Sequence, residues 1–410
     1  MRQFQSDLLN LLAERGHIHQ ITDAEALDAL AAKQVVTGYV GFDPTASSLH
    51  IGNLASIMLL RRLQQAGHRP IVIMGGGTAK VGDPSGKDDV RQLLSEDRLR
   101  ENIASIGDTF QRMLSFDDSP TGALLLNNDD WLSRLGYVEL LRDVGRHFTL
   151  NRMLTFDSVR LRLDREQPLT FLEFNYMILQ AYDYVVLARE YGCRLQLGGS
   201  DQWGNIVNGI EPARRIDGTE LYGVTAPLLT RADGSKMGKS VSGAIWLNED
   251  ALPAWDFWQY WRNTDDPDVG RFLRLFTDIP LDEVARLEQL DGAEINEAKV
   301  VLANAVTTLV RGEEAARAAE ATAKRTFAGG GLGDDLPVLE IPREGMRLGA
   351  ACTAIGFTAS NGEAKRKIAE GAVRIDDEAV TDASLLIALN PGEQRKLSLG
   401  RKRHGILRAS

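Results

Sequence analysis

The amino-acid sequence predicts an α/β fold, with a parallel β-sheet that carries helices on both faces, then an all-helical region and a small α+β domain. Three observations support this fold class. Short apolar segments alternate with helical segments over the first half of the chain, which is the repeat of a parallel sheet. From residue 253 to about residue 326 the pattern is helical throughout. A glycine-rich stretch at 327–335 then leads into a segment that mixes helix and strand patterns.

The composition indicates a multidomain protein with a basic end. The chain has 410 residues, enough for two or three domains, and a net charge of −10. Residues 343–410 hold 12 lysines and arginines against 8 acidic residues, a charge of +4, which leaves −14 for the rest. Cys193 and Cys352 have no metal-binding spacing and are expected to be ordinary residues in a reducing compartment. No signal segment or run of ~18 apolar residues is present, so we expect a soluble, cytoplasmic protein without membrane contact.

The first strands and helices follow the spacing of a parallel crossover. Residues 4–16 and 23–33 have helical patterns, a strand ends near Gly41, and a helix at 54–65 is closed by Gly67. The apolar strand 70–74 comes next and runs into Gly75–Gly77. This glycine run lacks the dinucleotide-binding spacing, and the turn Gly82–Lys87 is too short for a P-loop, so neither an NAD enzyme nor a P-loop NTPase is supported.

The elements after residue 90 are placed by caps and glycines. We expect a helix at 95–114, a strand at 124–126 that stops at Asn127–Asp130, and a mostly helical segment at 131–160 without assigned chemistry. A capping box, Thr170-Phe-Leu-Glu173, predicts a long helix that ends near Tyr191 at Gly192. The strand 194–197 turns through glycines into a helix near Gly204. Near the C-terminus we expect a short helix after Met346 and a strand at 372–375.

Two separate stretches suggest a polyphosphate site. In Tyr39–Asn53 a strand, a turn at Asp43-Pro44 and a helix start bring Thr45 and His50 to backbone N–H groups that favour anions. The alternative is that His50 only caps the helix. The second stretch is Lys236-Met-Gly-Lys-Ser240, whose two lysines in a glycine-bearing loop can supply positive charge to phosphate oxygens.

The long helix predicts a polar site in apolar surroundings. Tyr176, Gln180 and Asp183 are spaced by four and three residues and therefore share one helix face. A buried carboxylate and amide need hydrogen-bond partners, so this face requires either a polar ligand or an internal hydrogen-bond network.

These motifs resemble a known family. His50-Ile-Gly-Asn53 and Lys236-Met-Gly-Lys-Ser240 resemble the H-I-G-H and K-M-S-K-S signatures of class I aminoacyl-tRNA synthetases. Tyr39–Thr45, Gly82–Lys87 and Leu197–Asn205 resemble the bacterial-type tyrosyl members, and the likeness extends over essentially the whole chain. It implies a Rossmann-like catalytic domain (1–235), a lysine loop and connection (236–250), a helical anticodon-side domain (251–328), a glycine-rich linker (329–342) and an RNA-binding domain (343–410).

The resemblance also implies a reaction and its partners. L-Tyrosine would be activated by ATP to tyrosyl-adenylate and pyrophosphate, and then be transferred to the 3′ end of tRNA(Tyr). Neither step needs a protein nucleophile, because positioning and charge stabilisation carry the rate. Mg²⁺ would arrive with ATP, since no acidic metal cage is apparent. A homodimer is implied as well.

Site residues follow from the matching motifs. The ATP phosphates would be contacted by Thr45, His50, Lys87, Arg91, Lys236 and Lys239. The remainder of the ATP site would comprise Gly41, Asp43, Gly52, Asn53, Gly199, Asp201 and Ser240. For tyrosine, Tyr39 and Asp183 would bind the phenolic hydroxyl, Asp83, Tyr176 and Gln180 the α-amino group, and Gln202 would complete the site.

Two departures and three alternatives accompany the resemblance. Asn53 replaces the second histidine of the first motif, but it can still donate a hydrogen bond to ATP; Gly238 replaces a serine of the second. The alternatives are a tryptophanyl-tRNA synthetase, a non-tRNA adenylyl transferase of the same superfamily, and a non-catalytic RNA-binding relative. An indole offers only one N–H, the helical region and basic end are unneeded for a simple adenylyl transfer, and the intact lysine loop argues against loss of activity.

Overall fold

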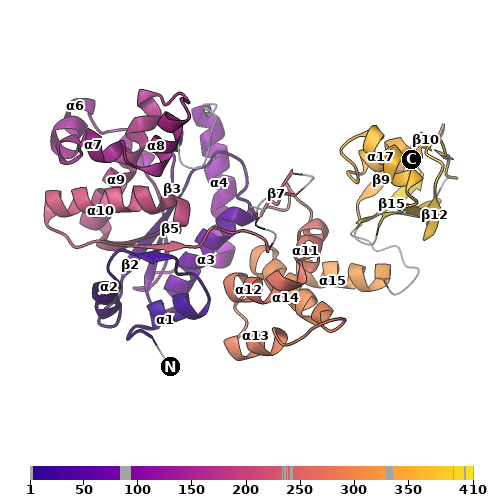
Figure 1. Cartoon of the computed structure of the whole chain (residues 1–410), viewed down its shortest axis with the longest axis horizontal. Coiled ribbons are helices and arrows are strands. Elements are labelled where there is room, and N and C mark those ends of the chain that lie inside the picture. Colours follow the sequence, from indigo (N-terminus) through magenta and orange to yellow (C-terminus); the bar gives the residue numbers. More distant parts are fainter. Residues whose placement is uncertain are drawn as a thin grey trace. The chain divides into compact units, whose positions relative to one another are not determined.

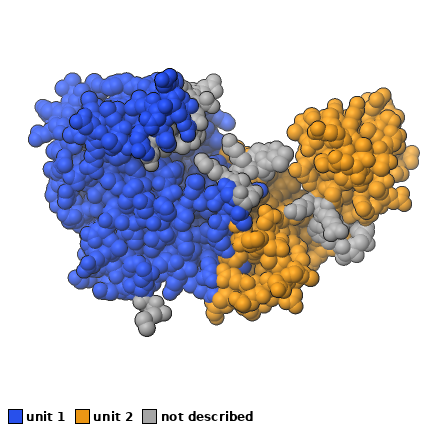
Figure 2. Space-filling view, in the orientation of Figure 1, with its two compact units in different colours: residues 1–237, 271–281 blue, residues 238–270, 282–410 orange. Residues whose placement is uncertain are grey.

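The chain folds into two compact units. The computed structural model describes residues 3–83, 94–232, 234, 237, 239–240, 243–327, 336–390, 392–400 and 403–409. Unit 1 comprises Met1–Met237 and Arg271–Leu281, and unit 2 comprises Gly238–Gly270 and Asp282–Ser410 (Figure 2). The five-part division expected from the sequence stays a prediction. In the described residues no helix is long and apolar enough to cross a membrane.

Unit 1 is built on a mostly parallel sheet of six strands in the order β1-β6-β5-β2-β3-β4. The strands are β1 (Gln20–Ile21), β2 (Thr37–Phe42), β3 (Arg69–Met74), β4 (Leu124–Asn127), β5 (Cys193–Gly199) and β6 (Tyr222–Ala226). All neighbours from β4 to β6 pair in parallel, and β1 pairs antiparallel with β6. The predicted parallel sheet is confirmed, whereas the two-residue edge strand β1 gave no signal in the sequence.

Helices cover both faces of this sheet (Figure 1). They include α1 (Asp7–Glu14), α2 (Ala24–Ala31), α3 (Ile51–Gln65), α4 (Glu96–Met113), α9 (Phe171–Tyr191) and α10 (Trp203–Asp217). The crossover through α3 leads from β2 to β3, and that through α10 leads from β5 to β6 in the opposite direction. Right-handed crossovers in opposite directions put α3 and α10 on opposite faces. The order reverses between β2 and β5, which is where a ligand crevice opens at the carboxyl edge.

Local signals fixed the ends of α9. Thr170 Oγ1 accepts from the Glu173 backbone N–H, and the Glu173 carboxylate accepts from the Thr170 N–H. At the other end Gly192 has φ +61°, a left-handed conformation that costs glycine little. The predicted capping box and glycine stop are therefore confirmed.

The segment 131–160 is mostly helical, as predicted, but it is divided into short pieces. It consists of short turns of helix: α5 (Asp129–Leu132), α6 (Tyr137–Glu139), Leu140–Val144, Gly145–His147, α7 (Leu150–Met153) and the start of α8 (Asp157–Asp164). Extended backbone at Gly136, Thr149 and Phe156 separates these pieces. The prediction of a mostly helical segment is therefore confirmed, and the structure adds the breaks between its pieces.

Unit 2 combines helices with a small mixed sheet. Helices α11 (Ala254–Arg262), α13 (Leu281–Leu287), α14 (Ile295–Arg311) and α15 (Glu313–Phe327) follow the hairpin of β7 (Lys239–Ser240) and β8 (Gly243–Ala244). Helix α12 (Asp266–Phe276) and the first residue of α13 extend into unit 1. The last domain holds α16 (Leu348–Ala354), α17 (Asn361–Ala369) and the sheet β12-β11-β14-β15-β9. These five strands are β9 (Val338–Ile341), β11 (Val373–Ile375), β12 (Glu378–Val380), β14 (Gln394–Leu399) and β15 (Arg403–Ala409), and β10 (Met346–Arg347) pairs with β13 (Leu386–Ile387).

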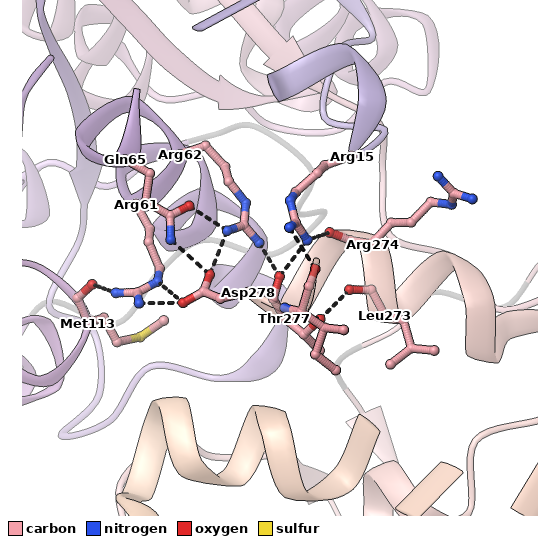
Figure 3. A network of polar contacts seen from close by, with 10 residues as sticks. Arg15, Arg61, Arg62, Gln65, Met113, Leu273, Arg274, Thr277 and Asp278 are labelled. Atoms are coloured by element: carbon pink, nitrogen blue, oxygen red, sulfur yellow. Dashed lines mark hydrogen bonds and ion pairs between the residues drawn. The ribbon is translucent and has the colours of Figure 1, made fainter. Parts of the chain in front are cut away.

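Three arginines hold the segment after α12 within unit 1 (Figure 3). Arg15 donates to the carbonyl oxygens of Thr277 (2.7 Å) and Ile279 (2.8 Å), and Arg62 donates to the Asp278 carboxylate (2.6 Å). Arg61 also pairs with Asp278. Cations at exposed carbonyls of a helix end are stabilising. Burial opposes ionisation of Asp278, but the arginines outweigh it and hold its pKa well below the usual range.

His17 lies fully buried beside these arginines. Burial, followed by the positive charges of Arg62 and Arg15, lowers the pKa of its imidazole to about 3. His17 is therefore neutral in the folded protein at neutral pH and in mild acid. The unfolded chain, in contrast, protonates this side chain near its ordinary pKa of about 6.5.

This difference predicts a loss of stability in mild acid. Because the folded pKa is lower than the unfolded one, the stability is complete above pH 6.5 and falls as the pH drops towards 3. Between pH 6.5 and pH 5 the free energy of unfolding should fall by about 2 kcal/mol on account of His17. His17→Leu should remove this part, leaving the contribution of His68, whose pKa burial also lowers, and the opposite contribution of Asp183, which stabilises the fold in acid because burial raises its pKa to about 7. Urea unfolding at both pH values tests this, and an unchanged pH dependence in the variant would contradict it.

Candidate active site

The loops that follow β3 and β4 dock tightly against each other. The Gly76 N–H donates to Asn127 Oδ1 (3.2 Å), and the Gly77 N–H donates to Asn128 Oδ1 (2.8 Å). A Cβ atom on Gly76 would lie 2.3 Å from Asn127 Oδ1, and one on Gly75 would lie 2.3 Å from Asp43 Oδ1. The glycine run therefore serves close backbone approach at the carboxyl edge of the sheet.

Asp183 on α9 is the buried charge of this region. Its side chain is 4% exposed and accepts hydrogen bonds from Asn128 Nδ2 (2.9 Å) and Trp131 Nε1 (2.7 Å). Burial, with a smaller contribution from the nearby charge of Asp43, raises its pKa to about 7, although both hydrogen bonds favour the charged form.

A chain of hydrogen bonds connects Asp183 to the end of β2. Asn128 Nδ2 also donates to Thr78 Oγ1 (3.0 Å), and this hydroxyl donates to Asp43 Oδ1 (3.1 Å). The chain joins α9 to the loops after β4, β3 and β2, and so arranges four segments around one carboxylate.

Among the buried polar atoms that have no hydrogen-bond partner in the described residues, two come from residues predicted to bind tyrosine. They are the hydroxyl of Tyr39, whose side chain is 2% exposed on β2, and Oε1 of Gln180 on α9. The Tyr39 ring packs edge-on against Tyr184, with ring centroids 5.2 Å apart. Burial, then Tyr184 and Asp183, raises the Tyr39 pKa well above its usual value. An unpaired buried hydroxyl costs about 1–3 kcal/mol, so a polar ligand group is expected here.

The structure brings further predicted residues to the same edge. Asp83 accepts from Gln202 Nε2 (3.2 Å), and Gln202 in turn accepts from Asn205 (3.0 Å). This bond joins the loop after β3 to the loop after β5. Tyr176 is buried on α9, one turn before Gln180.

Asn128 and Trp131 are functional candidates that sequence reasoning missed. The alternative of an internal hydrogen-bond network is correct for Asp183, but its partners come from the end of β4 rather than from α9. A signal was available: Asn127–Asp130 directly follows a parallel strand, and such positions line the ligand edge.

His50 caps helix α3, as the alternative interpretation expected. Its Nδ1 accepts from the Gly52 N–H (3.0 Å), and Asn53 Oδ1 accepts from the His50 N–H (3.1 Å). A neutral imidazole that accepts at Nδ1 carries its proton on Nε2. The cap therefore prepares Nε2–H as a donor, so capping and anion binding are compatible. A Cβ atom on Gly52 would lie 2.7 Å from the imidazole, which explains the glycine.

The remaining predicted residues divide into placed and unplaced ones. Thr45 is exposed in the loop before α3, close to Asp43. A Cβ atom on Gly41 would meet no atom within 4 Å, and one on Gly199 would lie 2.5 Å from Asp201 Oδ1. Lys87, Arg91 and Lys236 lie outside the described residues, and so does Gly238. Lys239 and Ser240 form β7 in unit 2.

The chain matches the family model described as "tRNA synthetases class I (W and Y)" over residues 31–328. It is 66% identical over 408 residues to a tyrosine–tRNA ligase of Novosphingobium aromaticivorans and 58% identical over 409 residues to one of Zymomonas mobilis, each alignment covering both chains completely. Among solved structures, a C-terminally truncated mitochondrial tyrosyl-tRNA synthetase of Aspergillus nidulans aligns with a TM-score of 0.71 at 29% identity, over 78% of this chain and 94% of that chain.

The hydrogen bond from Trp131 lowers the pKa of the Asp183 carboxyl, and this effect can be tested by removing the donor. Trp131→Phe removes a donor that favours the charged carboxylate, so the Asp183 pKa should rise above about 7. Infrared titration of the protonated carboxyl band measures this pKa, and Asp183→Asn identifies the band by its absence. A pKa that stays the same or falls in Trp131→Phe would contradict the arrangement.

Proposed function

This chain belongs to the class I tRNA synthetases of the tryptophan and tyrosine group, and we propose that Tyr39 and Asp183 select its amino acid. The reaction is tyrosine–tRNA ligation, the activity of its full-length relatives, and it uses tyrosine, ATP and tRNA(Tyr). The tryptophanyl, adenylyl-transferase and non-catalytic alternatives are therefore set aside.

Tyr39 and Asp183 form the proposed tyrosine slot, and the observation that supports it is the unpaired Tyr39 hydroxyl beside the buried Asp183. A phenolic hydroxyl can donate to the Asp183 carboxylate and accept from Tyr39, so it satisfies both groups at once. Phenylalanine would leave the Tyr39 hydroxyl buried and unpaired, and it would give Asp183 no donor beyond Asn128 and Trp131. An indole N–H could reach Asp183, but it offers no acceptor to Tyr39.

The amino end of tyrosine is assigned to the opposite part of the same edge. Gln180 Oε1, buried without a partner, is an acceptor for the α-ammonium group. Tyr176 and Asp83 supply further acceptors, and Gln202 holds Asp83 in place. A cation in this position also offsets the negative charge of Asp83.

The ATP site is assigned to the start of α3 and the neighbouring loops. His50 Nε2–H, the Thr45 hydroxyl and the helix N-terminus supply donors to phosphate oxygens. Gly41 leaves open space for the nucleotide, and Asp43, Gly52, Gly199 and Asp201 line its path. Because Asn53 Oδ1 is used by the His50 N–H, its amide Nδ2 is the group available to ATP. Lys87, Arg91, Lys236, Lys239 and Ser240 complete the proposed contacts.

The residues present suit catalysis by positioning and charge. Donors at His50, Thr45 and the lysines stabilise charge on the leaving pyrophosphate, while the tyrosine slot holds the attacking carboxylate near the α-phosphorus. Mg²⁺ would bind with the ATP phosphates and neutralise part of their charge.

The RNA-binding role is assigned to the basic C-terminal domain. Helix α17 carries Lys365, Arg366 and Lys367 in succession, and the domain has its own hydrophobic core. Clustered lysines and arginines attract the phosphates of RNA. A cytoplasmic location is consistent with a protein that acts on tRNA.

A homodimer is supported by exposed apolar side chains that gather between residues 137 and 172. They are Tyr137, Val138, Leu141, Leu150, Leu154, Leu161, Leu163, Phe171 and Leu172, of which Val138 is 76% exposed. Such a concentration of apolar surface marks a protein interface, and a second copy is the partner proposed for it.

The slot predicts a specific loss in two variants. Asp183→Asn keeps the shape but removes the charge that accepts from the phenol, so kcat/KM for tyrosine should fall by about 100-fold or more. Tyr39→Phe should lower kcat/KM for tyrosine by about tenfold, and this variant should reject phenylalanine less strongly. ATP–pyrophosphate exchange with each amino acid in turn measures both effects, with the melting temperature as a control for folding. Unchanged tyrosine activation in Asp183→Asn would refute the slot.

Charged substitutions in this apolar surface should dissociate the proposed dimer. Val138→Glu and Phe171→Glu together should convert the dimer to monomers, because two carboxylates would have to be buried in the interface. Analytical ultracentrifugation gives the mass. Val35→Glu is the matched control, since Val35 is also an exposed apolar residue but lies outside this surface. A wild-type monomer, or a double variant that remains dimeric, would contradict the assignment.

A further inference from the structure

The loop between β2 and α3 is held by a helix to which no function has been assigned. Asn102 Nδ2 on α4 donates to the carbonyl oxygen of Pro44 (2.8 Å), and Ser105 Oγ donates to that of Ser47 (2.7 Å). Asn102 and Ser105 are three residues apart and so lie on one face of α4. Their two acceptors bracket Thr45 and Ala46.

The loop has exposed residues, Thr45 and Ser47, between buried ones. Pro44 and Ser48 are buried, whereas Thr45 between them is exposed. The bonds therefore fix backbone on either side of a side chain that points away from the fold. Beyond Ser48 the chain enters α3 at His50.

Helix α4 is itself well placed to act as a fixed support. Its N-cap Ser95 accepts from the Arg98 N–H, and its buried face includes Ile106 and Phe110. The Phe110 ring packs on Phe42, the last residue of β2, with centroids 4.9 Å apart. Helix α4 thus contacts the loop at its origin on the sheet and again at Pro44 and Ser47.

Packing alone is a poor explanation for an asparagine at position 102. Its side chain is 1% exposed, and its amide oxygen has no partner among the residues that the structure describes. A leucine of similar size would fill this space without burying an unpaired oxygen. What leucine could not supply is the donor to the Pro44 carbonyl.

We propose that Asn102, assisted by Ser105, is a positioning residue for ATP activation. The pair fixes the Pro44–Ser47 backbone so that the Thr45 hydroxyl and the His50 cap face the phosphates together. This inference rests on the proposed roles of Thr45 and His50. It adds a requirement that no residue of the signature motifs carries, because the support comes from α4.

The test compares Asn102→Leu, Ser105→Ala and the double variant with the unmodified protein. Single-turnover formation of tyrosyl-adenylate should slow about tenfold in Asn102→Leu, less than the roughly 100-fold that a full 1 Å displacement of a reacting group causes. The double variant should be slower again. The dissociation constant for tyrosine should stay within about twofold, since the slot lies on other elements. The melting temperature of Asn102→Leu should change little, because removal of the unpaired amide oxygen offsets the loss of the hydrogen bond to Pro44.

Two further variants separate the explanations. Ile106→Val loosens a buried neighbour on the same face of α4 without touching a hydrogen bond; an equal slowing there would assign the effect to helix packing and overturn the proposal. Thr45→Ala tests the proposed ATP contact itself. If Thr45→Ala is slow and Asn102→Leu is normal, the positioning role fails and the ATP assignment stands. A normal Thr45→Ala removes the ATP assignment first, and the positioning role with it.

Discussion

The buried carboxylate of Asp183 is the constraint on which the rest of the site depends. A charge taken out of water destabilises the fold unless hydrogen bonds replace the lost hydration. Asn128 and Trp131 supply them, and Asn128 is bonded in turn to the loop after β3. The need to satisfy one carboxylate therefore determines how α9 and the ends of two strands meet. The glycines at 75–77 follow from the same constraint, because side chains there would separate these loops.

Helix α3 transmits a second constraint from the far side of unit 1. It begins at His50 and carries Arg61 and Arg62 near its other end, about 20 Å away at 1.5 Å per residue. Arg62 is fully buried and bonded to Asp278, so the helix cannot rotate or slide without breaking that pair. Burial lowers the pKa of Arg62 to about 10, yet the group stays charged near neutral pH. The orientation of the His50 cap is thus fixed at both ends of one rigid element.

The sequence could predict the features that depend on local chemistry. Caps and glycine stops defined α9, and the motif around His50 located the start of α3, because those signals act within a few residues. The roles of Asn128 and Trp131 could not be predicted in this way. They arise only when β4 pairs with β3 so that Asn127 lies beside Met74, which brings distant residues to α9. The hydrogen bond from Asn102 to the Pro44 carbonyl is equally non-local, since it joins α4 to a loop 58 residues earlier. The breaks within segment 131–160 were not predicted, because they occur at residues whose extended backbone has no strong local signal.

The two halves of the proposed site differ in whether water can replace a missing hydrogen bond. The tyrosine slot is built from buried side chains, Tyr39 and Asp183, to which water has little access. When a ligand fails to pair with them, no solvent molecule replaces the missing bond, so selectivity arises from an uncompensated loss. The start of α3 instead offers backbone N–H groups, an exposed Thr45 and a partly exposed His50, which water can satisfy before ATP arrives. In the proposed site, amino-acid choice therefore depends on burial, whereas the rate of activation depends on how accurately a surface loop is held. This explains why the support of that loop by Asn102 matters although the residue touches neither substrate.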